Sequence, residues 1–165
     1  MVDKSNIVKA KSFAFRYISY RFRSIKEVAE RLKRQGYANS TIKATVGRLI
    51  ELGYLDDNRF ALEWTHSMVK NKNLGRKRII QGLKDKGIDR NIRERIMVDL
   101  DDSKEMLSAR SALHSWRRKT PVKGRSQTKE RFSAYRHLIL KGFSSATSLA
   151  VLNDLFGKSD LDESR

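Results

Sequence analysis

The sequence predicts an all-α protein built as an elongated tandem array of three three-helix repeats. A single proline among 165 residues, where about 5% is usual, favours long helices over a turn-rich β fold. Apolar residues recur at helical spacing in one segment after another. A leucine four residues before a glycine, with an apolar residue after it, occurs at Gly36, Gly87 and Gly142. These glycines lie 51 and 55 residues apart, which indicates three copies of one supersecondary unit.

The first repeat is expected over residues 7–53. Its first helix is predicted from apolar side chains at helical spacing, although the aromatic residues there also alternate as they do in a strand. Ser24 and Glu27 form the capping box that begins the second helix, because each side chain satisfies a free backbone N–H group. The third helix begins near Asn39 or Ser40. Its predicted buried residues are Ile42, Val46, Leu49 and Ile50.

The second repeat, residues 56–100, follows the same plan. Either Asp56 or Asp57 is expected to cap its first helix, because a carboxylate there accepts backbone N–H bonds and complements the helix dipole. Gly75 precedes the second helix and Asp89 caps the third. The predicted apolar faces comprise Phe60, Ala61, Trp64, Met68, Ile79, Ile80, Leu83, Ile92, Ile96 and Leu100.

The third repeat is expected over residues 102–157, with a polar linker at 119–126 and a frayed tail at 158–165. Asp102 and Glu105 are predicted to form its capping box. The predicted core residues are Leu107 or Met106, Leu113, Trp116, Phe132, Tyr135, Leu138, Leu149, Leu152, Leu155 and Phe156. Units of this size bury too little surface to be very stable alone, so we expect a stacked array that offers a long binding face.

Several classes of protein are excluded by what the sequence lacks. Without cysteine there is no disulfide, no cysteine-ligated zinc and no thiol nucleophile. The three histidines, His66, His114 and His137, have no metal-ligand spacing, so we expect no metal and no cofactor. No apolar stretch is long enough for a membrane span, and arginines interrupt the apolar residues that a signal peptide would need. We expect a cytoplasmic protein, and a monomer.

The net charge of +17 and an isoelectric point near 10.4 indicate a polyanionic partner, either nucleic acid or an acidic protein surface. A run of charges is commonly no more than a solvated helix face. Solubility, however, needs a net charge of only about 2–8 in a small domain, so the surplus suggests a use. The densest basic stretch, residues 104–136, has ten basic residues and two acidic ones.

Basic residues off the apolar stripes are the candidate contacts to such a partner. Arg117, Arg118 and Lys119, with Lys123 and Arg125 in the linker, are the strongest candidates, because long side chains at a helix end are free to reach outward. For the first three, the alternative is that cations merely complement the dipole at a helix C-terminus. The other candidates are Arg21, Arg23, Arg34, Lys70, Lys72, Arg76, Lys77 and Arg136.

A catalytic interpretation has little support. The pair Asp56 and Asp57 could hold a metal or run acid–base chemistry, but no histidine, nucleophile or phosphate-binding glycine loop accompanies it, and helix capping explains it. Phe60, Trp64 and Trp116 could stack on bases, although their helical spacing favours a place in the core. We therefore expect no enzyme.

One segment of the second repeat carries a family resemblance. The stretch Gly-Tyr-Leu-Asp-Asp-Asn-Arg-Phe-Ala at 53–61 is followed at the right distance by the glycine and basic residues of 75–79, and then by Leu-Lys-Asp-Lys-Gly-Ile at 83–88. Together with the capping box of the first repeat, these motifs resemble the RecX family of regulatory proteins over about residues 10–157. The third repeat matches more loosely, with Lys141 where the family often has arginine.

The resemblance implies a regulator of the RecA recombinase, with a place in DNA repair, DNA recombination and the SOS response. RecX-like proteins bind the RecA–DNA filament along its groove and hinder filament extension, ATP hydrolysis and strand exchange. Single- or double-stranded DNA is a further candidate partner. No short motif marks the recombinase contacts of the family, so the basic residues named above rest on charge alone.

Two other functions stay open. A stand-alone basic DNA-binding module, similar to helix-turn-helix proteins, is compatible with three-helix units and high charge. Against it, no single helix concentrates the arginine, asparagine and glutamine residues that read bases. A nuclease would need a catalytic constellation that the sequence does not supply. Metal-dependent DNA cleavage that is lost on replacing Asp56 and Asp57 would identify one.

Overall fold

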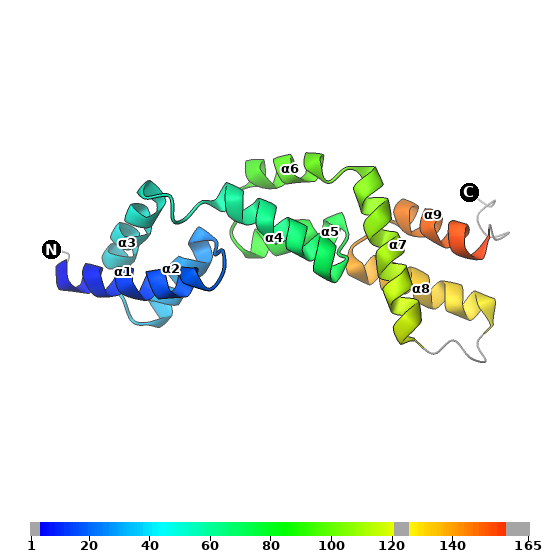
Figure 1. Ribbon diagram of the computed structural model, residues 1–165, viewed down its shortest axis with the longest axis horizontal. Helices are drawn as coiled ribbons and strands as arrows, with labels where there is room; N and C mark the ends of the chain where they lie inside the picture. The colour runs from blue at the N-terminus through cyan, green and yellow to red at the C-terminus, as the bar shows by residue number, and fades with distance from the viewer. Residues whose placement is uncertain (1–3, 121–125, 158–165) are drawn as a thin grey trace. The chain divides into compact units, whose positions relative to one another are not determined.

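The computed structural model describes residues 4–120 and 126–157. Within these ranges the chain forms nine α-helices and no strand, so the all-α prediction is confirmed (Figure 1). The helices are α1 (Lys4–Ser19), α2 (Ile25–Arg34), α3 (Asn39–Glu51), α4 (Asp57–Lys72), α5 (Arg76–Asp85), α6 (Arg90–Asp99), α7 (Asp102–Lys119), α8 (Gln127–Lys141) and α9 (Ser145–Phe156). Most of the predicted linker and all of the predicted tail lie outside the described residues.

The chain divides into two compact units. The N-terminal unit comprises the chain to Trp64 together with Leu83–Glu94, and the C-terminal unit comprises Thr65–Gly82 and the chain from Arg95 onward. Helices α4, α5 and α6 are therefore shared between the units. None of the helices in the described ranges has the length and apolar character that crossing a membrane requires.

In the N-terminal unit, helices α1, α2 and α3 pack on one another around a core of their own (Figure 1). The predicted capping box is confirmed: Glu27 N donates to the Ser24 hydroxyl at 3.2 Å, and Ser24 N donates to Glu27 Oε2 at 3.1 Å. The prediction that Ile50 is buried is wrong, because its side chain is 43% exposed. It follows the buried Leu49 directly, and one residue turns a helix by about 100°. The core residues are Ala10, Ala14, Val28, Leu32, Ile42, Val46, Leu49 and Leu55.

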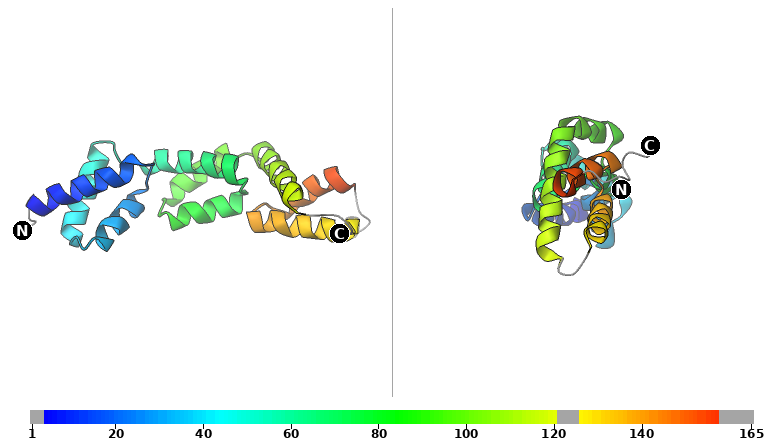
Figure 2. Two further views of the ribbon diagram at one scale, coloured as in Figure 1. Left: turned by 60° about the horizontal axis from the view of Figure 1, so that its bottom comes forward. Right: turned by 90° about the vertical axis from the view of Figure 1, so that its right-hand side faces the viewer.

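In the C-terminal unit, helices α7, α8 and α9 pack on one another around a second core (Figure 2). The N-cap of α7 is Asp101 and not the predicted Asp102, because Asp101 Oδ1 accepts from Lys104 N at 2.8 Å. The predicted capping box is therefore wrong, and the carboxylate of Glu105 accepts instead from Arg76 N at 3.3 Å. The core residues are Ala109, Ala112, Leu113, Ala134, Leu138, Phe143, Val151 and Leu152.

Several apolar residues predicted in the third core are exposed. Phe132 and Leu107 are 68% and 62% exposed, and Leu155 and Leu149 are 41% and 36% exposed. Of the alternatives on α7, Met106 packs against the core. On α7 and α8, the buried residues beside Leu107 and Phe132 include the small residues Ala109, Ala112 and Ala134. Helices that pack through alanine leave the larger neighbouring side chains outside the contact.

Candidate functional site

Most of the predicted basic candidates lie free at the surface. Arg21 and Arg117 are exposed but form ion pairs. The exposed candidates without an ion pair are Arg34, Lys70, Lys72, Lys77, Arg118, Lys119 and Arg136. Arg34 Nε donates to the carbonyl of Glu30 at 3.4 Å, and the other charged groups of this set make no hydrogen bond or ion pair with the described residues. Their full charge is available to a partner. Lys123 and Arg125 lie outside the described residues.

Three lysines of the C-terminal unit gather where helices end. Lys72 closes α4, Lys119 closes α7 and Lys141 closes α8, and Lys141 Nζ donates to the Lys72 carbonyl at 2.7 Å. Burial lowers the pKa of Lys141, and the positive charges of Lys119 and Lys72 lower it further. Burial, and then the charge of Lys141, likewise lower the pKa of His137. Two of the predicted candidates thus share one cationic cluster with Lys141, which sequence reasoning missed as a site residue.

Arg117 is occupied within the C-terminal unit. Its Nε donates to Glu130 Oε1 at 2.9 Å, and the Glu130 side chain is only 9% exposed. The guanidinium carbon also lies 5.6 Å from the centre of the Phe156 ring. A buried carboxylate needs such a partner, so Arg117 has a structural task that Arg118 and Lys119 lack.

Arg76 also has internal partners in the C-terminal unit, and more of them than Arg117. Its Nε and Nη2 donate to the carbonyl of Leu100, and its Nη1 pairs with Asp102 Oδ1 at 2.7 Å. Its Nε also lies 3.7 Å from Glu105 Oε2, on a side chain that is 5% exposed. The guanidinium therefore joins the start of α5 to the junction between α6 and α7. The use of Arg76 and Arg117 as partner contacts stays a prediction.

Arg21 and Arg23 lie in the loop between α1 and α2. Arg21 Nη2 pairs with Glu27 Oε1 at 2.9 Å, and Lys86 Nζ pairs with the same oxygen at 2.6 Å. Arg23 lies over the ring of Tyr17, with its guanidinium carbon 4.0 Å from the ring centre. Both arginines keep part of their surface in solvent, so each holds the loop and still presents charge.

The adjacent carboxylates Asp56 and Asp57 have different structural roles. Asp56 Oδ1 accepts from Asn58 N at 2.8 Å and from Arg59 N at 3.2 Å, which caps α4 and lowers the pKa of Asp56. Asp57 Oδ1 accepts from Ile25 N at 2.9 Å. Burial raises the pKa of Asp57 by more than this bond lowers it. In the described ranges, no three histidine, aspartate or glutamate side chains gather as a metal site would require.

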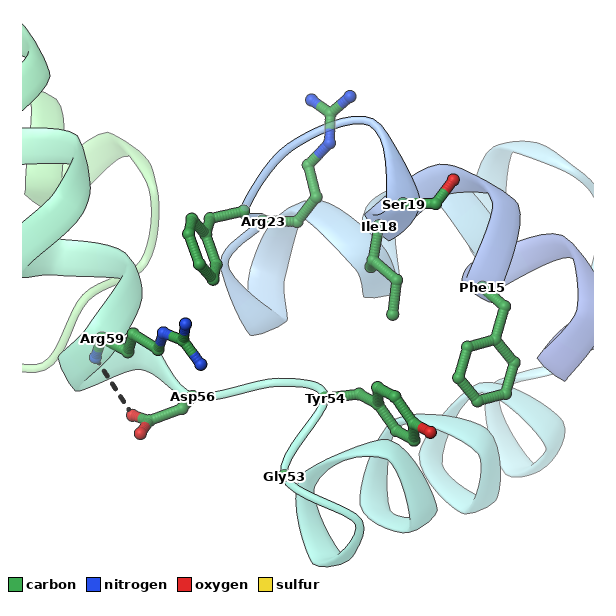
Figure 3. A pocket seen from close by; sticks show the side chains of 9 residues that line it. Phe15, Ile18, Ser19, Arg23, Gly53, Tyr54, Asp56 and Arg59 are labelled. Carbon is green, nitrogen blue, oxygen red and sulfur yellow. Dashed lines mark hydrogen bonds between the residues drawn. The ribbon is translucent and has the colours of Figure 1, made fainter.

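A cavity of about 310 Å³ opens in the N-terminal unit, beside the end of α1 and the loop between α3 and α4 (Figure 3). The rings of Phe15 and Tyr54 meet edge to face, with centres 4.8 Å apart and planes at 88°. Arg59 lies over the ring of Phe22, its guanidinium carbon 4.7 Å from the ring centre. Figure 3 shows Ile18 and Arg59 directed toward the space beside the Tyr54 ring.

This cavity was not predicted from the sequence, because the aromatic residues weighed there for base stacking, Phe60, Trp64 and Trp116, all lie inside predicted helices. Phe60 is 1% exposed and belongs to the core, as its spacing predicted. Tyr54, by contrast, is 56% exposed and Phe22 is 46% exposed. One signal was available: Tyr54 follows a helix-ending glycine as Phe143 does, yet Asp56, Asp57 and Arg59 come soon after it.

Comparison with known proteins gives a consistent match along the chain. The family model described as RecX, first three-helix domain, matches residues 10–49, and the model described as RecX, second three-helix domain, matches residues 56–97. The Regulatory protein RecX of Prosthecochloris aestuarii is 30% identical over 154 residues, which cover 93% of this chain and 98% of that protein. The Regulatory protein RecX of Lactobacillus delbrueckii subsp. bulgaricus is 30% identical over 171 aligned residues, and this chain spans 60% of its length.

Solved structures share the arrangement of helices. The crystal structure of RecX from Lactobacillus salivarius superposes with a TM-score of 0.77 at 24% identity, covering 92% of this chain and 97% of that one. The crystal structure of a second regulatory protein RecX gives a TM-score of 0.77 at 19% identity. At these identities the likeness speaks for the fold, and with the two matched three-helix domains it confirms the predicted array of three-helix repeats.

Proposed function

We propose that this chain, which belongs to the RecX family of regulatory proteins, binds the RecA–DNA filament along its groove. Bound there, it inhibits filament extension, ATP hydrolysis and strand exchange, and it acts as a binding protein and not as an enzyme. The observation that carries the proposal is the match to the Prosthecochloris aestuarii relative, which spans nearly the whole of both chains.

The surface charge supports a polyanionic target. Lys70, Lys77, Arg118, Lys119 and Arg136 all belong to the C-terminal unit and are exposed. A filament of protein and DNA offers both phosphates and acidic side chains to such residues. Each phosphate contact on a single strand lowers log K by about 0.7 for each tenfold rise in salt, so the inhibition should weaken steeply with ionic strength.

The lysine cluster offers a specific contact within that surface. The charges of Lys119 and Lys72 repel the charge of Lys141, and this repulsion contributes to the lowered pKa of Lys141. An anion among the three ammonium groups relieves the repulsion, so the cluster gains free energy from a bound phosphate or carboxylate. We include Lys141 in the proposed contact surface for this reason.

The experiment is DNA-dependent ATP hydrolysis by a RecA recombinase on single-stranded DNA, titrated with the protein at two salt concentrations. Inhibition well below the concentration that saturates the DNA supports the filament as the target. Inhibition only when the protein coats the DNA supports competition for bare DNA. The absence of any effect at low salt would contradict the proposal.

The second candidate is a stand-alone DNA-binding module, favoured by the exposed aromatic rings beside arginines at the cavity of the N-terminal unit. It predicts equal affinity for bare DNA and for the filament. Filament regulation predicts tighter binding to the filament. Measuring both affinities with the same labelled protein in the same buffer separates the two functions.

A further inference from the structure

We propose that the cavity lined by Phe15, Phe22, Tyr54 and Arg59 binds an unpaired nucleobase of single-stranded DNA. The inference goes beyond the proposed inhibition of a recombinase, because it assigns the chain a direct DNA contact of its own. It is tested on bare DNA, so its failure is distinguishable from a failure of the proposed function.

The cavity has the size of a site for one small flat group. Its volume is about 310 Å³, at the lower end of the range of about 300–1,000 Å³ that is usual for small-molecule sites. Its walls are formed by α1, the loop after α1, the loop that leads into α4, and Arg59 at the start of α4.

The exposed rings suit stacking. Tyr54 and Phe22 are 56% and 46% exposed at the cavity, although aromatic side chains gain most from being covered. Phe15 meets Tyr54 edge to face and so steadies the Tyr54 ring, while Tyr54 stays 56% exposed. A nucleobase covers such a ring face to face and gains stacking energy whatever its sequence.

The charge at the cavity suits the DNA backbone. Arg23 and Arg59 line it; in Figure 3 the Arg59 guanidinium points toward the space beside Tyr54, whereas the Arg23 guanidinium points away from it, and Arg23 lies over the Tyr17 ring. Asp56 is the one acid among the described lining residues, and its Oδ1 is committed to backbone N–H groups at the start of α4. Residues 1–50 carry 12 basic and three acidic side chains, so the surroundings attract phosphate.

The occupant is DNA and not a peptide because the cavity combines exposed aromatic residues with two cationic side chains, Arg23 and Arg59, against the single acid Asp56. Arg59 makes no ion pair among the described residues and rests on the Phe22 ring. When a base stacks on Tyr54, the adjoining phosphates of the strand come within reach of long arginine side chains. An acidic peptide that carries an aromatic residue would share this chemistry in part, and the test below distinguishes it.

The experiment measures fluorescence anisotropy of a labelled single-stranded oligonucleotide and of an abasic strand of the same length. Both strands carry the same phosphates, so any difference in affinity reports on the bases. The wild-type protein should prefer the strand with bases. Tyr54→Ala should weaken binding to that strand by about fivefold or more and abolish the preference, whereas Tyr54→Phe keeps the ring and should bind as the wild type does.

Phe132→Ala is the matched control, since Phe132 is also an exposed aromatic residue, 68% exposed, on α8 of the C-terminal unit. It should leave the affinity for both strands unchanged. Equal affinity of Tyr54→Ala and the wild type for the base-bearing strand would overturn the proposal. So would loss of filament inhibition by Tyr54→Ala with unchanged oligonucleotide binding, because the cavity would then serve a protein partner.

Discussion

Gly75 and Gly142 touch through their backbones in the C-terminal unit, although 66 residues separate them along the chain. A Cβ atom added at Gly75 would overlap the carbonyl group of Gly142. Two backbone hydrogen bonds join the two segments: Gly75 N donates to the Lys141 carbonyl at 2.9 Å, and Lys77 N donates to the Gly142 carbonyl at 3.0 Å. The start of α5 and the end of α8 thus meet at a spacing that only glycine permits.

Replacing Gly75 by alanine should destabilise the protein. The methyl group would meet backbone atoms that cannot rotate away, and inserting an atom group into a closely packed site costs about 1–3 kcal/mol. We expect a lower midpoint of thermal unfolding, measured by circular dichroism, and weaker protection of the Gly75 and Lys77 amides against hydrogen exchange.

Gly47→Ala is the matched control. A Cβ at Gly47 would meet nothing within 4 Å, and Gly47 lies inside α3, where alanine is favoured over glycine by about 0.5–1 kcal/mol. This variant should unfold at a slightly higher temperature than the wild type. Unfolding of Gly75→Ala at or above the wild-type temperature would contradict the tight contact.

The sequence predicts local features well because they depend on neighbouring residues. The Ser24–Glu27 capping box and the glycine that ends α8 each involve residues within one helical turn, and both are observed. The contact between Gly75 and Gly142 could not be predicted, because nothing in the local sequence links α5 to α8. Ile50 was misplaced for a related reason: a helix with two adjoining apolar positions does not reveal which one faces the core.

In the candidate site, too, features set by the local sequence could be predicted, and features set by contacts between distant segments could not. That basic residues lie off the apolar stripes follows from periodicity, and Lys77 and Arg136 are exposed as expected. An internal ion pair, in contrast, can depend on a carboxylate that is distant in the sequence, as it does for Arg76 and Glu105. The cavity beside Tyr54 depends on two loops from different helices, so spacing within one helix gives no sign of it.

Charge reversal at the end of α7 should separate binding from stability. Arg118→Glu combined with Lys119→Glu should weaken filament binding, since both side chains are exposed and free of internal partners. The midpoint of thermal unfolding should stay close to that of the wild type, because exposed charges contribute less than about 1 kcal/mol. Inhibition of recombinase ATP hydrolysis measures the first effect, and differential scanning calorimetry the second.

Arg117→Glu, in contrast, should lower the stability of the protein. It would place a carboxylate against Glu130, whose side chain is 9% exposed, and a buried charge without its partner is strongly destabilising. We expect a clear fall in the unfolding temperature. If the double variant at 118 and 119 lost stability and Arg117→Glu did not, the assignment of roles along this helix end would be reversed.

Glu27→Gln should reduce stability in a pH-dependent manner. Burial opposes ionisation of Glu27, but hydrogen bonds from Lys86, Arg21 and Ser24 outweigh it, so the folded-state pKa lies below the usual 4.5. A lowered pKa means that the carboxylate stabilises the fold above pH 4.5 and that this contribution is lost as the pH falls through the folded-state value. Glutamine keeps the capping geometry, so the variant isolates the charge.

The measurement is the difference in free energy of unfolding between wild type and Glu27→Gln as a function of pH. At neutral pH we expect about 1–2 kcal/mol, between the values for exposed and for buried ion pairs, and convergence in acid. The difference is the correct quantity because Asp57, whose pKa is raised by burial, acts with the opposite sign in the same range. A difference that stays constant down to acid pH would contradict the ion-pair role.

Arg76→Lys should lower stability while leaving the net charge unchanged. The planar guanidinium reaches the Leu100 carbonyl, Asp102 and Glu105 at once, and an ammonium group lacks this fork of donors. The nearly buried Glu105 would lose part of its pairing, so we expect a loss of about 1–3 kcal/mol, as for other buried hydrogen bonds to charged groups, seen in urea unfolding. Lys77→Arg exchanges the same two residue types at the exposed neighbouring position and should leave stability unchanged.

The two variants also test whether Arg76 contacts a partner, because both conserve the net charge. If Arg76→Lys is stable but no longer inhibits the recombinase, Arg76 is a partner contact. If it is destabilised but inhibits normally at low temperature, Arg76 is a structural residue.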